Sequence, residues 1–442
     1  MLNREKPINH NLYRFAYALA AVGSVASQPA QAGVAVTWTR QIGTAADDES
    51  FGVSADGLGN VYLTGRTQGS LGGPSAGSFD GFVSKYDAAG ALQWTRQIGT
   101  GSDDYGLSVS ADGLGSVYIS GYTYGSLGGP NVGAADAFVT KYDSVGVFQW
   151  TQQLGTDAFD YGEAVSADGL GNVFISGWTG GSLGGPSAGN FDAFVSKYDA
   201  AGISQWTRQL GTASLDAITD ISADSLGNVY ISGDTAGSLG GPNIGGFDIF
   251  VSKYNTGGAL QWTKQLGTAN NDQSYGVSAD GLGNVYLTGS TEDGSFVSEY
   301  DAAGVLQWTQ QLGAVGNGGV SADGLGNVYI SGWTDGSVAG DVDAFVSKYD
   351  AAGVFQWIKQ LGTAAVESST GVSADGLGNI YISGDTYGSL AGPNAGRVDA
   401  FVSKIAEVGV PEPSTGAIAF MLSVFGLYVA GRPHRAVSLN RS

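Results

Sequence analysis

"VSADGLGNVYLTG", residues Val53–Gly65, is the phrase that decides the fold of this 442-residue chain. It joins two short runs of strand-forming residues through "DGLGN", a turn in which Gly can adopt a positive φ. The phrase therefore predicts a β-hairpin. Close variants return six times, and their first turn residues are Asp112, Asp168, Asp224, Asp280, Asp323 and Asp375. Repetition of one hairpin indicates a repeat architecture.

The repeat unit is longer than the hairpin and contains four predicted strands. In the first copy these strands cover residues 51–56, 61–67, 80–87 and 91–99. Trp marks the last strand of each unit, with a spacing of 56 residues that shortens to 46 and 49 at the end: Trp38, Trp94, Trp150, Trp206, Trp262, Trp308 and Trp357. The chain thus holds seven units of four short strands between residues 33 and 405.

Side-chain size favours an all-β, seven-bladed β-propeller of four-stranded antiparallel blades. The first strand of each unit carries small residues and the fourth carries Trp and Leu, as expected if blades converge on an axis and separate at the rim. The chain enters on a fourth strand, residues 34–43, and leaves on a third, residues 399–405. We therefore expect the N-terminal strand to close the last blade, which removes free sheet edges.

The repeats resemble a known family. "DGLGNVYLTG" and "FVSKYDAAG…W" are similar to the SBBP repeats of bacterial β-propellers, and the resemblance covers nearly all of residues 33–405. It implies the fold and no particular activity, because propellers host many unrelated functions.

The first 32 residues read as a secretory signal. A basic start precedes the short apolar run "FAYALAAVGSVA", and Ala30 and Ala32 frame a small-x-small site with cleavage expected before Gly33. The apolar run is too short to span a bilayer comfortably. Signal peptidase is therefore an expected partner.

Residues 406–442 form a tail of different character. Pro411, Glu412 and Pro413 precede an uncharged apolar segment, residues 416–431, and Arg432 and Arg435 follow it. This order resembles the PEP-CTERM sorting signal, which implies transient membrane insertion and processing by an exosortase-type enzyme in a Gram-negative-type bacterium. Two residues separate Arg432 from Arg435, unlike the compact basic cluster typical of that signal. A plain C-terminal membrane anchor is the alternative.

Composition excludes several classes of chemistry. The chain has no Cys, and its two His residues, His10 and His434, lie in the terminal segments. Ser-His-Asp and Cys-His catalysis and His-ligated zinc are therefore excluded from the repeats. The formal net charge of −21 argues against nucleic-acid binding.

Two ordered sets of Asp are the candidate binding residues. The first set lies in the connections between one unit and the next and comprises Asp48, Asp104, Asp160, Asp216 and Asp272. The second set precedes the third strand of its unit and comprises Asp80, Asp136, Asp192, Asp248, Asp343 and Asp399. Both connections emerge at the same end of a four-stranded meander, so we expect one strongly negative face.

Three roles are open for these carboxylates. They can cap turns by accepting bonds from backbone N–H groups. They can bind calcium, although no EF-hand loop is present and no metal site is assigned. They can include a glycosidase-like carboxylate pair, for which Glu163 and Glu367 stand out because they interrupt the repeat pattern. No other cofactor is expected.

Trp178 and Trp333 are candidates for stacking on sugar rings. They occupy a second-strand position at which other copies have Arg, Tyr, Asp or Ser. The alternative is packing between blades at the rim.

Together these features predict an exported, non-enzymatic protein of the cell surface or extracellular matrix. Its acidic, Gly-rich loops would bind extracellular polysaccharide or surface proteins. A carboxylate-dependent enzyme acting on extracellular glycans and a calcium-stabilised structural protein are the alternatives.

Overall fold

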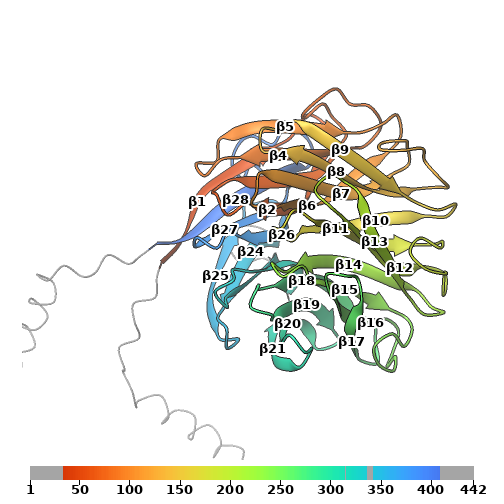
Figure 1. The fold of residues 1–442 in the computed structure, drawn as a ribbon. Helices are drawn as coiled ribbons and strands as arrows, with labels where there is room; N and C mark the ends of the chain where they lie inside the picture. Colours follow the sequence, from red (N-terminus) through yellow and green to blue (C-terminus); the bar gives the residue numbers. More distant parts are fainter. Residues whose placement is uncertain (1–32, 314, 336–341, 409–442) are drawn as a thin grey trace, which may run out of the picture. The chain divides into compact units, whose positions relative to one another are not determined.

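The computed structural model describes residues 33–313, 315–335 and 342–408, and all regular elements in these ranges are β-strands (Figure 1). The signal segment and the sorting tail from residue 409 onward lie outside them, as does the apolar segment 416–431. A search of the described ranges finds no helix that could cross a membrane.

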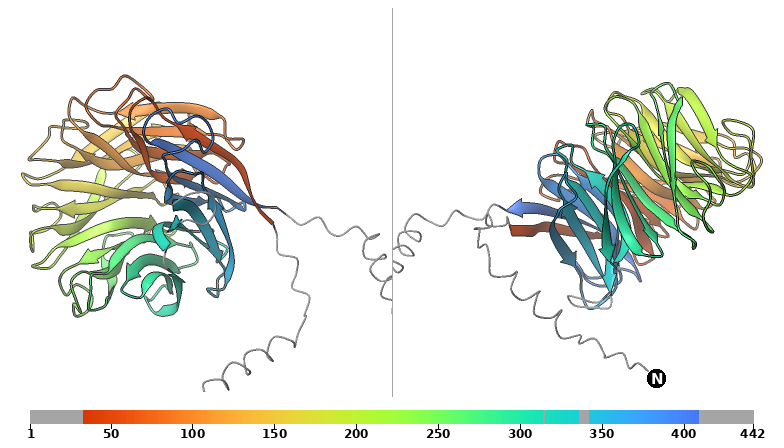
Figure 2. Two further views of the ribbon diagram at one scale, coloured as in Figure 1. Left: turned by 180° about the vertical axis from the view of Figure 1, so that it is seen from behind. Right: turned by 90° about the horizontal axis from the view of Figure 1, so that it is seen from below.

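The strands form seven separate four-stranded antiparallel sheets, here called blades 1 to 7 (Figures 1 and 2). This confirms the predicted fold class. Blade 1 consists of β2 (Asp48–Ala55), β3 (Val61–Thr67), β4 (Asp80–Tyr86) and β5 (Leu92–Ile98), and blade 2 of β6 (Asp104–Ala111), β7 (Ser116–Thr123), β8 (Asp136–Asp143) and β9 (Phe148–Leu154). Blade 3 consists of β10 (Asp160–Ala167), β11 (Val173–Thr179), β12 (Asp192–Tyr198) and β13 (Ser204–Leu210), and blade 4 of β14 (Asp216–Ala223), β15 (Val229–Thr235), β16 (Asp248–Tyr254) and β17 (Leu260–Leu266).

The remaining blades follow the same plan, with a shorter connection between the second and third strands in blades 5 and 6. Blade 5 consists of β18 (Gln273–Ala279), β19 (Val285–Thr291), β20 (Gly294–Tyr300) and β21 (Leu306–Gly313), and blade 6 of β22 (Val315–Ala322), β23 (Val328–Asp335), β24 (Val342–Tyr349) and β25 (Phe355–Leu361). Blade 7 consists of β26 (Glu367–Ala374), β27 (Asn379–Thr386), β28 (Asp399–Val408) and β1 (Gly33–Ile42). The N-terminal strand thus pairs with β28, as predicted.

The hydrophobic core lies between adjacent blades. The second and third strands are covered on both sides, so Val61, Leu63 and Phe82 of blade 1 are fully buried against Tyr381 and Val402 of blade 7. This explains why β3 and β4 read as nearly continuous apolar and small residues rather than as an alternating pattern.

In six blades the Trp of the fourth strand links its blade to the next. Trp38 of β1 donates a hydrogen bond from Nε1 to Ala88 O of blade 1 at 3.1 Å, and Trp94 makes the same bond to Ser144 O of blade 2 at 3.3 Å. The ring of Trp38 covers Gly90, whose φ is +75° and where a Cβ would lie 2.7 Å from the indole. The Gly of the "AAG" turn is therefore required both by conformation and by space.

A closed circle of hydrogen bonds joins the first strands around the axis. In each blade the Ala N–H of "VSAD" donates to the Ser Oγ of the preceding blade at 2.9–3.0 Å: Ala55 to Ser373, Ala111 to Ser54, Ala167 to Ser110, Ala223 to Ser166, Ala279 to Ser222, Ala322 to Ser278 and Ala374 to Ser321. The innermost strands do not pair with one another as sheets, so these side chains satisfy the otherwise unpaired inner N–H groups.

Candidate ligand-binding site

The first set of Asp caps the connections between blades. Asp160 accepts bonds from the backbone N–H and the Oγ1 of Thr156, at 2.6 and 2.8 Å, and from Thr179 Oγ1. Asp48, Asp104, Asp216 and Asp272 repeat the bond from the Thr four residues earlier. Glu367 takes the same role in blade 7.

The second set of Asp holds the long loop of each blade onto the fourth strand. Asp80 accepts from Ala76 N–H at 2.8 Å and from Gln97 Nε2 at 2.6 Å, and Gln97 in turn accepts from Leu71 N–H of the same loop. Asp136, Asp192, Asp248 and Asp399 make equivalent bonds. Asp343 is the second residue of β24, the third strand of blade 6, and is also buried.

The expectation of a strongly negative face is therefore corrected. The two kinds of connection do meet at one end of the propeller, since Asp104 N–H donates to Phe79 O at 2.8 Å. All eleven Asp of the two sets are, however, at most 1% exposed. The loops fold over their own carboxylates to satisfy backbone N–H groups, so a ligand at the surface meets the loops and not the Asp side chains. Burial raises the pKa of Asp48, Asp104 and Asp216, and the Thr bonds oppose this rise.

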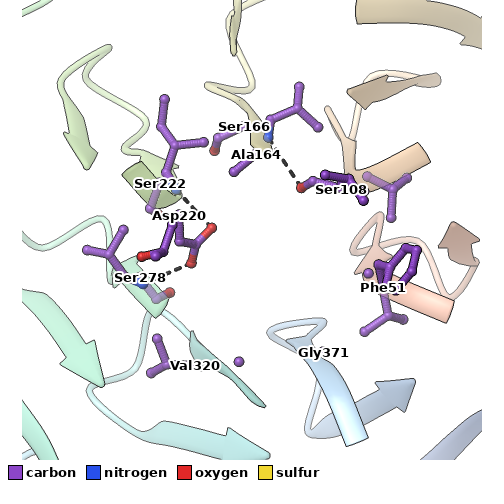
Figure 3. A pocket seen from close by; sticks show the side chains of 18 of the residues that line it. Phe51, Ser108, Ala164, Ser166, Asp220, Ser222, Ser278, Val320 and Gly371 are labelled. Carbon is purple, nitrogen blue, oxygen red and sulfur yellow. Dashed lines mark hydrogen bonds between the residues drawn. The ribbon is translucent and has the colours of Figure 1, made fainter. Parts of the chain in front are cut away.

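A β-bulge interrupts the first strand of every blade near this end. The bulged residues vary between blades and are Phe51, Leu107, Glu163, Thr219, Tyr275, Gly318 with Gly319, and Thr370. Most of them line an axial cavity of about 280 Å³ that all seven first strands surround (Figure 3). The bulge thus places the most variable residue of the repeat on the axis.

Two carboxyl groups lie on the wall of this cavity, Glu163 and Asp220, and no Lys or Arg lines it. Asp220 accepts from the N–H groups of Ile221 and Val277, each at 2.8 Å (Figure 3). Burial raises the pKa of Asp220 to about 7 and also raises the pKa of Glu163. Ser108 takes the place of Asp220 in blade 2 and accepts from Val165 N–H at 3.2 Å.

A continuous row of aromatic rings crosses blades 1 to 3 at the same end. We call it the aromatic row, and it consists of Phe79, Tyr105, Tyr122, Tyr161, Trp178 and Phe191. Successive ring centroids along the row are 5.6, 4.7, 4.3, 4.2 and 4.7 Å apart. All six side chains are partly exposed. Tyr124 and Phe159 extend the row and are 39% and 42% exposed.

The aromatic row connects to the axial cavity near both of its ends. Trp178 donates from Nε1 to Glu163 Oε1 at 3.0 Å. At the other end the Arg66 guanidinium lies 4.5 Å from the Phe79 ring and 5.5 Å from the ring of Phe51 on the cavity wall. Arg66 is also paired with Glu49 at 2.7 Å. The row therefore borders one mouth of the cavity.

Trp178 and Trp333 occupy the same repeat position in different surroundings. Trp178 stacks on Tyr161 within the aromatic row, whereas Trp333 in β23 is 40% exposed and faces Gly316 across the sheet. Trp178 could be identified from the sequence, whereas the tyrosines were missed. The sequence did contain a signal for these tyrosines. The residue after the capping Asp of a first strand pairs with the second-strand residue that is Trp178 in blade 3. This pairing joins Tyr105 to Tyr122 in blade 2 and Tyr161 to Trp178 in blade 3.

Two observations concern the metal and catalytic alternatives. Across the described ranges no three Asp, Glu or His side chains are grouped so that they could hold a metal ion. Of the two Glu that interrupt the repeat pattern, Glu367 is a buried cap and Glu163 lies beside the aromatic row, so the two have separate structural settings.

The beta-propeller repeat model named SBBP matches seven times, at residues 37–72, 93–128, 149–184, 205–240, 261–296, 307–338 and 356–391. Each match joins the fourth strand of one blade to the first two strands of the next.

Two curated relatives share the repeats over part of their length. The regulatory protein FlaEY of Caulobacter vibrioides is 29% identical over 269 residues, which is 56% of this chain and 27% of that protein. An uncharacterized WD repeat-containing protein, L264, of Acanthamoeba polyphaga mimivirus is 25% identical over 43% of this chain and 18% of its own length. This chain therefore spans less than a third of either relative.

Solved propellers superpose at low identity. The Pan2 WD40 domain of Neurospora crassa has a TM-score of 0.48 and 9% identity, covering 84% of this chain and 96% of that one. An ulvan lyase of polysaccharide lyase family PL25 has a TM-score of 0.47 and 13% identity, covering 86% and 99%.

Proposed function

Because the chain belongs to the SBBP family of beta-propeller repeats, we propose that it is a non-enzymatic binding scaffold whose aromatic row binds extracellular polysaccharide. The propeller provides a rigid support, and the differences among its blades provide the site. The observation that carries the proposal is the continuity of six partly exposed rings over blades 1 to 3.

The position of the row distinguishes it from ordinary core packing. The four central rings, Tyr105, Tyr122, Tyr161 and Trp178, stand at two repeat positions whose counterparts in blades 4 and 5 are small or polar: Ala217 and Asp234, and Gln273 and Ser290. Binding surfaces are enriched in rigid aromatic side chains that combine an apolar face with a polar edge, as Tyr and Trp do. The apolar faces of sugar rings match such a surface.

The shape of the row fits a chain ligand better than a compact one. Its rings follow one another across three blades, and the Tyr124 and Tyr161 hydroxyls, which are hydrogen-bonded to each other at 2.9 Å, add polar groups at its edge. Several sugar units could therefore be contacted together, each contributing a small part of the affinity.

The terminal segments extend this proposal to a cellular location. Their sequences favour export through residues 1–32 and sorting through residues 406–442, with signal peptidase and an exosortase-type enzyme as processing partners. The protein would then act at the cell surface or in the extracellular matrix.

Affinity electrophoresis of the full chain in gels that contain dextran, alginate or a bacterial exopolysaccharide tests the binding role. We expect at least one of these to retard the protein, and Trp178→Ala and Tyr122→Ala to weaken the retardation roughly tenfold, equivalent to about 1.4 kcal/mol. Trp333→Ala is the matched control, because it removes an exposed Trp at the same repeat position outside the row. Equal losses in Trp178→Ala and Trp333→Ala, or no retardation by any polysaccharide, would contradict the proposal.

A further inference from the structure

Seven leucines form an exposed ring at the end of the propeller opposite the aromatic row. Each is the central residue of a "DGLGN"-type turn between the first and second strands, and each is between 62% and 74% exposed: Leu58, Leu114, Leu170, Leu226, Leu282, Leu325 and Leu377. The first strands surround the axis, so the turns that follow them encircle it as well.

The turn itself does not need leucine. In the first copy Asp56 Oδ1 accepts from the N–H groups of Leu58 and Asn60, at 2.8 and 3.0 Å, and Gly57 and Gly59 supply the positive φ values. The Leu side chain takes no part in these bonds. Exposed leucine at all seven turns therefore calls for a role outside the fold.

Most carboxylates of the same turns are covered, whereas Asp56, Asp323 and the Asp of the outer turns, such as Asp87 and Asp199, are partly exposed. Asp112, Asp168, Asp224, Asp280 and Asp375 are 3–7% exposed, because their own turns cover them. An approaching apolar surface would meet Leu and Gly and would not have to desolvate these charges.

A second apolar belt lies farther from the axis at the same end. It consists of residues at the start of the fourth strands that are 46–62% exposed: Leu92, Val147, Phe148, Ile203, Leu260, Val305, Leu306, Val354 and Phe355. We call this belt and the seven leucines together the leucine face. So many exposed apolar side chains at one end of a protein indicate an interaction surface.

The chain continues from the leucine face toward its apolar tail. Ala406 of β28 pairs with Asn379, two residues after Leu377, so the C-terminal part of β28, which ends at Val408, lies at this face. Nine residues, 407–415, separate Ala406 from the uncharged segment 416–431, and they can span at most about 30 Å. If that segment enters a bilayer, the leucine face is held within this distance of the lipid.

We propose that the leucine face rests on a lipid bilayer surface, with its leucines and outer belt in the interfacial layer. The formal net charge of −21 disfavours anionic lipid, so the proposal is for a zwitterionic surface such as phosphatidylcholine. It rests on the membrane-directed tail of the proposed function and not on polysaccharide binding. The opposite end, with the aromatic row, would then face away from the membrane.

The absence of Cys allows a direct test with single labels on the full chain. An environment-sensitive dye is attached at Leu58→Cys or Leu226→Cys on the leucine face, and at Ser75→Cys or Ser187→Cys in exposed loops at the opposite end. With phosphatidylcholine vesicles, we expect blue-shifted emission and protection from iodide only at the two leucine positions. Equal responses at all four positions, or no association with vesicles, would overturn the proposal.

Two further measurements distinguish lipid contact from self-association and from anchoring by the tail alone. A blue shift that appears without vesicles and grows with protein concentration would assign the face to a second copy of the chain and overturn the lipid proposal.

A label at Ala88→Cys, in an exposed turn of this face, is then compared between the parent protein and a variant in which Ser replaces all seven ring leucines. We expect the replacement to reduce the blue-shifted fraction roughly tenfold; an unchanged fraction would show that the tail alone positions the protein and would overturn the proposal. Trp178→Ala should leave these signals unchanged, which keeps the test independent of polysaccharide binding.

Discussion

Ala55 in the first blade donates its N–H to Ser373 in the last at 3.0 Å, and this bond completes the circle that six equivalent bonds build around the axis. Blade 7 also contains the N-terminal strand, so ring closure has two independent supports: β1 at the rim and the Ser–Ala bond at the hub.

Ser373→Ala tests the hub contribution to closure. The substitution leaves Ala55 N–H without its acceptor, and we expect a loss of about 1–3 kcal/mol in the free energy of unfolding. Ser166→Ala breaks the equivalent bond between blades 3 and 4 and is the control. Denaturant unfolding should give similar losses for both variants, and a negligible loss in Ser373→Ala would show that β1 alone closes the ring.

Asp160→Ala tests the capping role of the first Asp set. It removes the acceptor for Thr156 N–H and for the hydroxyls of Thr156 and Thr179. We expect destabilisation by about 2–4 kcal/mol. Asp199→Ala, in a solvent-exposed turn, should cost less than half as much. Loss of polysaccharide binding without loss of stability in Asp160→Ala would instead assign this Asp to a ligand.

Chelation tests the calcium alternative directly. All eleven Asp of the two sets are buried, one oxygen of Asp80 and of Asp160 accepts bonds from the chain's own donors, and no three acidic side chains of the described residues are grouped to hold a metal ion. We therefore expect EDTA to leave the melting temperature unchanged within error. A fall of several degrees that added calcium reverses would support a calcium-stabilised protein.

Asp220→Ser gives a prediction for the pH dependence of stability. Burial raises the pKa of Asp220 from 3.8 to about 7, so the folded state binds this proton more tightly than the unfolded state does. Its contribution is therefore most favourable below pH ~4 and is lost as the pH rises toward ~7.

Ser at this position reproduces blade 2, where Ser108 accepts the equivalent N–H, and it carries no charge. We expect Asp220→Ser to be more stable than the parent at pH 8, by on the order of 1–3 kcal/mol, and to lose this advantage at pH 4. Melting curves at both pH values decide the matter. An advantage that is equal at pH 4 and pH 8 would mean that titration of Asp220 has no part in it.

Glu163→Gln separates a binding scaffold from a carboxylate-dependent enzyme. Gln keeps an acceptor for Trp178 Nε1, so the aromatic row should stay in place and polysaccharide affinity should remain within about twofold. If the protein turned over a glycan and this variant abolished the turnover, the enzymatic alternative would replace the scaffold.

The regular part of this structure could be predicted from sequence because every blade repeats the same physical solution. The positions of Gly57 and Gly59, the strand-forming residues of Val61–Thr67 and the small residues of "VSAD" each specify a local geometry, and seven copies remove the ambiguity of any single one. The β-bulge was not foreseen. The first strand begins at Asp48 rather than Phe51, and a two-against-one pairing has no fixed sequence signature.

The binding surface was harder to predict because it depends on cross-strand register. Trp178 was visible as an unusual residue, but its contact with Tyr161 requires that β10 and β11 be aligned residue by residue around the bulge. The Asp sets were visible as a regular pattern, yet only the folded loops show that their carboxylates are covered.

The pairing of β1 with β28 also determines how the propeller responds to mechanical force. The two strands are antiparallel neighbours, as shown by the bonds from Thr37 to Lys404 O and between Thr39 and Ser403, and their free ends lie at the same end of blade 7. Tension applied between the two ends of the propeller would load these bonds one at a time, as in unzipping, rather than all together in shear. A propeller held at only one end carries no such load, so a single tether would preserve the ring under flow whereas attachment at both ends would open it.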